Sequence, residues 1–339
     1  MIKGFFMSKL KTFLFLTALF ISDYGLSAVQ PLHIYAEEYF AADWGPAPEV
    51  KAQFERAYPQ CQVTIQSFDS RTTMLNRLRL EGKNTKADIV LGMDNHQLEA
   101  AEKTGLFAPA KVDFSRLSLP VEWKNTTFVP YEFSKYAFIY DKSKLTNPPE
   151  SLKELVERED LKVIYQDPRT SSIGRGLLVW MNKIYPPEQV EKAWQQLQKH
   201  TLTVGKGWSE TYGTFLKGEG DLVLSNNTSP IYHLLTDQKE NYAATEFSEG
   251  ETLQIDFAGK IAGKHNICAD EFLAFLLKPE IQNIIITKGV MLPVVEGDLE
   301  PHYAALKNAV MQGKTIDTLS VSAEQIKHWI EVWQRALSK

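Results

Sequence analysis

The sequence predicts an α/β fold of two lobes with a ligand cleft between them. Strand-like and helix-like segments alternate along most of the chain, a pattern typical of sheets covered by helices on both faces. The 339 residues also exceed the usual size of one hydrophobic core. Finally, two extended segments, residues 135–140 and 253–258, are placed to carry the chain into a second lobe and back. A cleft between two such lobes is a natural place to clamp a small ligand.

The first lobe is expected to contain three strand–helix units in chain order. Apolar and β-branched residues alternate, as they do in strands, over residues 32–35, 62–67 and 87–91. Apolar residues recur at helical spacing over residues 49–57, 70–80 and 96–103. Strands that alternate with helices in this way form a parallel sheet. We assign residues 29–132 and 254–295 to this lobe.

The second lobe is expected to follow a similar plan. A strand at residues 163–166 comes after a helix at residues 151–158. Two further helices are expected at residues 171–185 and 187–200, and a terminal amphipathic helix at residues 322–337. We assign residues 133–253 and 296–339 to this lobe.

The segment at residues 204–232 is the clearest candidate for a ligand site. It is expected to form a loop, a helix, a short buried strand and the start of a second helix. Trp208 is placed in the loop, with Ser209 as the N-cap of the first helix. Ser229 is the expected N-cap of the second helix, with Pro230 at its first position. Ligands bind where the carboxyl ends of strands meet helix N-termini in open α/β sheets. An ordinary strand–helix unit with a core tryptophan would show the same pattern.

Residues 1–28 have the features of a secretory signal peptide. Three lysines precede an apolar run at residues 12–21, which is too short to span a bilayer. Small residues follow at the end of the segment and offer a cleavage site. The mature protein is therefore expected to be exported to the periplasm.

The mature chain is acidic. The full chain has a formal net charge of −5, and removal of the signal peptide takes away three lysines and one aspartate, which leaves about −7. This charge, without basic clusters, argues against nucleic acid as a partner and mildly favours a cationic ligand. The two cysteines, Cys61 and Cys268, lie far apart and neither belongs to a CxxC motif. Two cysteines in an exported chain could pair, but we favour free, buried thiols.

No motif of a known catalytic or cofactor site is present. The seven histidines do not cluster at metal-ligand spacing, and HExxH, GxxxxGK[ST] and GxGxxG are absent. Gly207, Trp208 and Ser209 are not followed by the second glycine of a nucleophile elbow. We therefore expect a binding protein without a cofactor or a metal. The alternative is an exported enzyme that uses Glu37 and Asp69 as its acid and base.

A cleft that binds a small organic cation needs aromatic faces, which contribute roughly 0.5–2 kcal/mol each, and a carboxylate. The candidates for the aromatic faces are Trp44, Trp208 and Tyr232. Asp69 is the candidate carboxylate. A helix N-terminus that could hold a phosphate or hydroxyl is formed by Ser171, Ser172 and Gly174. Alternatively, the tryptophans belong to the core, and Asp69 and Ser171 only cap helices.

Several long strings along the mature chain are specific enough to indicate a family. They include FAADWGP at residues 40–46, VIYQDPRTS at residues 163–171 and KGWSETYGTFLKGEGDLVLS at residues 206–225. They resemble the periplasmic thiamine-binding proteins of bacterial ABC importers. The resemblance implies a type II periplasmic-binding-protein fold, thiamine or its phosphates as ligands, and delivery to a membrane permease. The ligand-contacting residues that it implies are Trp44, Asp69, Ser171, Trp208 and Tyr232.

The resemblance also indicates where this chain differs. Three positions at which the family has ligand-enclosing aromatic residues correspond to Glu37, Asn226 and Val290. Glu37 could replace stacking by charge, Asn226 could form a hydrogen bond, and Val290 leaves space. A receptor for another cationic or phosphorylated small molecule, or for a polyamine, therefore remains an alternative. Ferric ion is a weaker candidate because the late segments contain no adjacent tyrosine pair.

Overall fold

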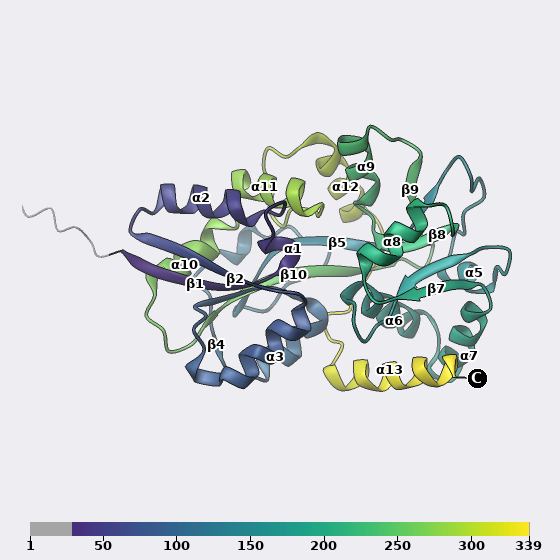
Figure 1. The fold of residues 1–339 in the computed structure, drawn as a ribbon, viewed down its shortest axis with the longest axis horizontal. Coiled ribbons are helices and arrows are strands. Elements are labelled where there is room, and N and C mark those ends of the chain that lie inside the picture. The colour runs from purple at the N-terminus through teal and green to yellow at the C-terminus, as the bar shows by residue number, and fades with distance from the viewer. Residues whose placement is uncertain (1–28, 339) are drawn as a thin grey trace, which may run out of the picture.

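The computed structural model describes residues 29–338, so the signal peptide predicted at residues 1–28 lies outside the described residues. Two bodies of strands and helices lie side by side, with β5 (Phe128–Asp141) and β10 (Glu251–Ile261) running between them (Figure 1). This is the two-lobed α/β arrangement that the sequence predicts. None of the helices between residues 29 and 338 combines the length and apolar composition that a bilayer crossing requires.

The predicted strands and helices occur close to their expected positions. The other strands are β1 (Gln30–Glu37), β2 (Cys61–Phe68), β3 (Ile89–Asp94), β4 (Phe107–Ala108), β6 (Val163–Gln166), β7 (Thr201–Gly205), β8 (Leu222–Asn226), β9 (Tyr242–Ala244) and β11 (Thr315–Ile316). The helices in or next to the first body are α1 (Glu38–Ala41), α2 (Ala47–Ala57), α3 (Arg71–Glu81), α4 (Leu98–Glu102), α10 (Ile267–Phe275), α11 (Pro279–Gly289) and α12 (Pro301–Gln312). The second body contains α5 (Leu152–Glu157), α6 (Ser172–Ile184), α7 (Pro187–Gln198), α8 (Trp208–Leu216), α9 (Ser229–Asp237) and α13 (Ala323–Leu337). Short 3₁₀ turns occur at η1 (Gly82–Asn84), η2 (Asn95–Gln97) and η3 (Phe114–Arg116).

The sheet runs through both bodies in the strand order β2-β1-β3-β10-β5-β8-β6-β7. The strand–helix units pair in parallel as expected: β1 with β2 and β3 in the first body, and β6 with β7 and β8 in the second. The two long central strands, β5 and β10, are antiparallel to each other, and β10 is antiparallel to β3 as β5 is to β8. The carboxyl ends of the parallel strands therefore border the region where β5 and β10 cross.

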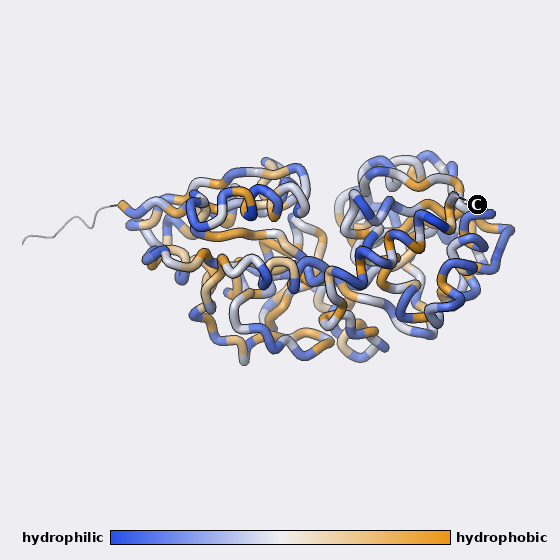
Figure 2. Tube along the Cα trace, turned by 90° about the horizontal axis from the view of Figure 1, so that it is seen from below, coloured by the Kyte–Doolittle hydropathy of each residue, from blue (hydrophilic) through white to orange (hydrophobic). Residues whose placement is uncertain are grey.

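Each body has its own hydrophobic core. The first includes Ile34, Leu91 and Phe272, and the second is built around Trp180 and Trp333. In Figure 2 the hydrophobic segments lie mostly within the two bodies, and the hydrophilic ones mostly along their outer surfaces. Complete burial of one such side chain is worth about 1.5–3 kcal/mol. Separate cores allow each lobe to behave as a unit.

The chain passes between the bodies a third time, which the sequence-based interpretation did not foresee. Tyr303 and Val310 of α12 pack into the first core, whereas Ile326 and Trp333 of α13 pack into the second. The connecting segment contains β11, which pairs in parallel with the start of β10. Residues 296–312 thus adjoin the first body, although the sequence grouped them with the second lobe. The full set of lobe boundaries stays a prediction.

Buried polar groups hold these crossings together. The Lys135 ammonium on β5 forms an ion pair with Glu251 on β10 (2.9 Å) and donates a hydrogen bond to the carbonyl oxygen of Lys314 (2.7 Å). Asn95, directly after β3, accepts a hydrogen bond from the Ile255 backbone N–H (2.8 Å) and donates to the Thr318 hydroxyl (3.3 Å). The three connections are therefore fixed to one another where the lobes meet.

The expectation of free thiols is wrong, because Cys61 and Cys268 form a disulfide. Cys61 begins β2, which lies beside β1, and Cys268 is in the first turn of α10. The Asn266 side chain donates to the Pro31 carbonyl oxygen (2.9 Å) and holds the start of α10 against β1. The two Cα atoms are 5.8 Å apart, within the range that a disulfide spans. Their separation of 207 residues hides this proximity.

Candidate functional site

The site candidates from the sequence cluster at the carboxyl ends of parallel strands. Glu37 is the last residue of β1 and Asp69 directly follows β2. In the second body, Asn226 is the last residue of β8, and Trp208 comes soon after β7. Parallel strands present their carboxyl ends along one edge of a sheet, which is where ligands bind in open α/β folds.

Trp208 provides a fixed flat surface at this edge. It is the first residue of α8 with Gly207 as the N-cap, whereas the sequence placed it in the preceding loop with Ser209 as the cap. Its ring stacks on Tyr212, with centroids 4.7 Å apart, and its Nε1–H donates to the Ser225 hydroxyl (2.7 Å). The side chain is still 42% exposed. Tyr212 covers one face of the indole, and the exposed part of the side chain leaves aromatic surface that a flat ligand ring can contact.

A network of hydrogen bonds and stacked rings holds the Trp208 side chain in place. The Tyr212 hydroxyl contacts Nε2 of buried His233 (2.9 Å), and the rings of the two residues stack in nearly parallel planes. Nδ1 of His233 contacts the Asp237 carboxylate at 2.9 Å. The Ser225 hydroxyl also forms a hydrogen bond with the Ser229 hydroxyl (2.8 Å). Ser229 belongs to the first turn of α9, although the sequence predicted it as the N-cap. The orientation of the Trp208 ring is therefore set before any ligand arrives.

A chain of polar contacts leads from this surface to the first body. Next to Ser225, the Asn226 amide donates to the Ser134 hydroxyl (2.5 Å) and to Oε1 of Gln254 (3.3 Å). The amide of Gln254 in turn donates to both oxygens of Asp256, at 3.2 and 3.1 Å. Asn226 therefore belongs to a hydrogen-bond network that connects the two bodies through Ser134, Gln254 and Asp256.

Asp256 is also one of four neighbouring carboxylates in the first body, which we call the carboxylate row: Glu37, Asp94, Glu132 and Asp256. Asp256 of β10 is the strand partner of both Asp94 on β3 and Glu132 on β5. Glu37 lies across from Gly92 of β3, where a Cβ atom on Gly92 would come within 2.9 Å of the Cβ of Glu37. Gly92 also has a φ of +100°, which glycine adopts readily.

The Arg71 guanidinium forms ion pairs with two carboxylates of this row. Arg71, the first residue of α3, binds Asp256 with two nitrogens, one of them at 2.8 Å, and lies 3.8 Å from Asp94. The Tyr39 hydroxyl donates to Asp256 at 3.2 Å, and the Arg71 guanidinium lies over the Tyr39 ring. Among residues 29–338, Arg71 is the cation in direct contact with this row, and Arg175 of α6 also lies close enough to lower the pKa of Asp94.

The shortage of positive charge changes the protonation of the row. Glu132 is fully buried, and neither of its oxygens has a hydrogen-bond partner among residues 29–338. Burial, together with the neighbouring Asp256, raises the pKa of Glu132 well above its ordinary range. Burial also raises the pKa of Glu37, to about 7, although Arg71 opposes this shift. Burial acts against ionisation of Asp94 too, but Arg71 lowers its pKa below the ordinary value.

The predicted helix N-terminus is present at α6. The Ser171 hydroxyl caps it by accepting a weak hydrogen bond from the Gly174 backbone N–H (3.4 Å), so this structural role is realised. A Cβ atom on Gly174 would lie 2.2 Å from the carbonyl oxygen of Gln166, so glycine lets α6 start directly against the end of β6. The Ser172 carbonyl oxygen accepts a long hydrogen bond from the Tyr136 hydroxyl (3.5 Å) on the crossing strand β5.

The remaining candidates are less closely tied to the row. Trp44, between α1 and α2, is 65% exposed, and Asp69 is exposed while Ser70, not Asp69, caps α3. Tyr232 on α9 is also largely exposed. Val290 ends α11 in the left-handed region, and its carbonyl oxygen accepts a hydrogen bond from the Thr228 hydroxyl of the second body (2.6 Å). Between residues 29 and 338, no hydrogen bond connects Trp44, Asp69 or Tyr232 to the carboxylate row.

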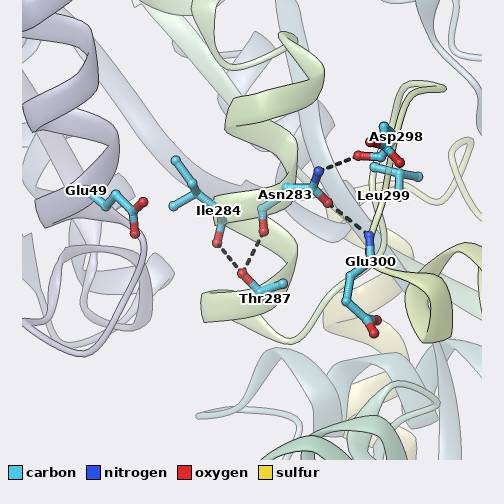
Figure 3. Close-up of a pocket in the computed structure, with 7 residues that line it drawn as sticks. All are labelled: Glu49, Asn283, Ile284, Thr287, Asp298, Leu299 and Glu300. Atoms are coloured by element: carbon cyan, nitrogen blue, oxygen red, sulfur yellow. Dashed lines mark hydrogen bonds between the residues drawn. The ribbon is translucent and has the colours of Figure 1, made fainter.

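An open surface groove lies elsewhere. It has a volume of about 410 Å³ and is lined by residues of α2, of α11 and of the segment at 298–300 (Figure 3). Asn283 anchors that segment through the carbonyl oxygen of Asp298 and the backbone N–H of Glu300. The groove contains none of the residues predicted from the sequence. We take the strand ends as the candidate site because fixed aromatic and charged groups occur there. Nowhere in residues 29–338 do three or more histidine, cysteine or carboxylate side chains form a metal-binding cluster.

The sequence-based interpretation missed Arg71, Asp94, Glu132 and Asp256. A usable signal was present for two of them. Asp256 interrupts LQIDFA, the strand expected at residues 253–258. Glu132 lies in FVPYEF, which leads into the strand expected at residues 135–140, and in the structure both residues belong to buried strands. A carboxylate within a buried strand is costly unless it is paired, so such a residue points to a charged partner or to function. Nothing local indicated Arg71.

Comparison with known proteins identifies the family. Residues 84–315 match the sequence profile of the bacterial extracellular solute-binding proteins, which is more than half of the chain. The chain belongs to this family. Membership agrees with the two-lobed fold, with a receptor rather than an enzyme, and with export from the cytoplasm.

Individual relatives of this solute-binding protein are similar over almost their whole length. The thiamine-binding periplasmic protein of Haemophilus influenzae is 56% identical over 335 residues, which cover 98% of this chain and 100% of that protein. The protein of the same name from Escherichia coli is 50% identical over 311 residues, 91% of this chain and 94% of that one. A solved periplasmic thiamin-binding protein superimposes with a TM-score of 0.81 at 48% identity, covering 91% of this chain and 96% of the other.

Proposed function

We propose that this solute-binding protein is the periplasmic receptor of an ABC importer and binds thiamine or its phosphates between its lobes. The names of the relatives support the ligand, and family membership supports the receptor role. In this proposal the exported protein delivers its ligand to a permease in the inner membrane. The residues proposed to contact the ligand or shape the cleft are Glu37, Trp44, Asp69, Ser171, Ser172, Gly174, Trp208, Asn226, Tyr232 and Val290.

The observation that carries the proposal is the fixed face of Trp208, joined through Asn226 and Gln254 to a row of carboxylates. Thiamine is an organic cation with two flat rings joined by a methylene group: a positively charged thiazolium and an amino-substituted pyrimidine. An aromatic face attracts such a cation by roughly 0.5–2 kcal/mol, and carboxylates accept hydrogen bonds from its N–H groups. The start of α6 at Ser171 offers backbone N–H groups for a hydroxyl or phosphate.

A polyamine receptor of the same fold is the second candidate, and the carboxylate row favours it. A polyamine is flexible and would gain little from a rigid flat surface such as that of Trp208. It would depend on the carboxylates alone. A polyamine receptor would bind its ligand through the carboxylates without using Trp208, whereas a thiamine receptor would use both.

Calorimetric titration of the ligand-stripped protein with thiamine, thiamine monophosphate and spermidine tests the proposal. We expect one-to-one binding of thiamine with micromolar or tighter affinity and no saturable heat from spermidine at the same concentrations. Saturable binding of spermidine by a folded protein that does not respond to thiamine would reject the thiamine proposal and select the polyamine candidate.

A further inference from the structure

The carboxylate row has a consequence for how a cation enters the cleft. Glu37, Asp94, Glu132 and Asp256 would carry four negative charges if all were ionised, and Arg71 supplies one positive charge. Like charges on adjacent strands in a buried site strongly disfavour full ionisation. The row must therefore contain bound protons when no ligand is present.

One of these protons is bound by Glu132, whose carboxyl group has no access to solvent. Glu132 is fully buried on β5, beside Asp256, and has no hydrogen-bond donor for either oxygen among residues 29–338. An ionised carboxylate in that position would lack both solvent and a partner, which is costly. Glu132 is therefore the neutral member of the row. Arg71 lowers the pKa of Asp94, so Asp94 keeps its charge. Burial raises the pKa of Asp256, and the Arg71 guanidinium that binds it directly opposes this shift.

Glu37 differs because it lies at the open end of the row. It ends β1 at the carboxyl edge of the sheet, it is only half-buried, and its own oxygen accepts a hydrogen bond from the Tyr39 backbone N–H (3.2 Å). The titratable or charged groups around it come from α1, α3, β3, β5 and β10, namely Glu38, Arg71, Asp94, Tyr131, Glu132 and Asp256. Only Arg71 among them is a cation. A new positive charge at the mouth of the row would meet mostly acidic neighbours.

We propose that the carboxylate row selects the cationic part of the ligand and that Glu37 gives up a proton in exchange for it. The inference rests on the function proposed above and deepens it. The positively charged ligand enters at the mouth of the row, the proton leaves the Glu37 carboxyl group for the solvent, and the resulting carboxylate faces the cation. Glu37 thereby determines specificity by charge, and Glu132 remains protonated throughout.

The sign of the pH effect follows from the raised pKa of Glu37, about 7. Above pH 7 Glu37 is ionised without the ligand, so the affinity for a cation is at its maximum and no proton is released. Below pH 7 the ligand must displace the proton, so the affinity falls by up to about tenfold for each pH unit. At pH 6.5 binding is expected to release about 0.7 proton per ligand.

Calorimetric titration with thiamine at pH 6.5, in two buffers with different heats of ionisation, measures this proton directly. In the unmodified protein the apparent heat should differ between the buffers by the amount that the released proton predicts. Glu37→Gln should make the heat independent of the buffer and flatten the pH dependence of the affinity. The exposed neighbour Glu38 provides the matched control, because Glu38→Gln should leave proton release in place.

Glu132→Gln separates the two roles within the row. Because Glu132 is already neutral, the amide should leave the number of released protons unchanged. Loss of proton release in Glu132→Gln but not in Glu37→Gln would overturn the assignment. If the unmodified protein binds thiamine with heats that do not depend on the buffer, the proton exchange is also rejected, but the proposed function still stands. If thiamine does not bind at all, the proposed function and the proton exchange are both rejected.

Discussion

Replacement of Trp208 by alanine is expected to weaken thiamine binding about 10- to 30-fold while the protein stays folded. Trp208 lies at the start of α8 and is 42% exposed, so its removal opens no large cavity. The loss corresponds to about 1.4–2 kcal/mol, the upper part of the range that an aromatic face contributes to holding a cationic ring from which water is excluded. Titration calorimetry of the variant at pH 8, where Glu37 is ionised, measures this loss separately from the protonation of the row.

Trp208→Phe is the matched control. Phenylalanine keeps a ring that can stack on Tyr212 but loses the hydrogen bond from Nε1 to the Ser225 hydroxyl. We expect a smaller loss than for alanine. Equal affinities of Trp208→Ala and the unmodified protein, with both folded by circular dichroism, would show that the ligand does not stack on this surface.

Replacement of Arg71 by methionine is expected to lower the free energy of unfolding by about 3–5 kcal/mol, measured by urea denaturation at pH 8. Arg71 is the single cation bound to Asp256, and it also lies near Asp94, and both carboxylates are fully buried. Without the guanidinium these charges remain in a site that solvent does not reach. Protonation of the two carboxylates would reduce the loss as the pH falls.

Two further variants make this expectation specific. Arg71→Met combined with Asp256→Asn removes both partners and should recover much of the lost stability, because a buried neutral pair is less costly than an unpaired charge. Arg77→Met breaks an exposed ion pair with Glu81 on the same helix and should change stability little. If Arg71→Met were as mild as Arg77→Met, the carboxylates would not depend on Arg71 for their charge.

Much of the fold could be predicted from local patterns, because alternation, helical spacing and capping residues act within a few positions. The strand at residues 163–166 occurs exactly as expected, and Ser171 and Ser322 cap the predicted helices. The disulfide and the third crossing could not be predicted in this way. Both depend on which distant segments pack together, and Cys61 and Cys268 meet only because α10 lies against the first strands.

The same limit applies to the site. Trp208 could be proposed because turn residues and a helix start mark its position in the sequence, and Asn226 could be proposed because the family resemblance indicated a replaced aromatic residue there. The carboxylate row could not, because it depends on strand register: Asp94, Asp256 and Glu132 are neighbours only through the pairing of β3, β10 and β5. Resemblance to a family pointed to Glu37 as a replaced aromatic position, but not to the carboxylates behind it.

A crystal structure of the protein with thiamine bound tests the central claim most directly. We predict density for the ligand between the two bodies, with one of its rings over the open face of Trp208 and its positive charge toward Glu37. Density for thiamine in the surface groove beside Asn283, with the strand ends unchanged, would contradict this account of the binding site.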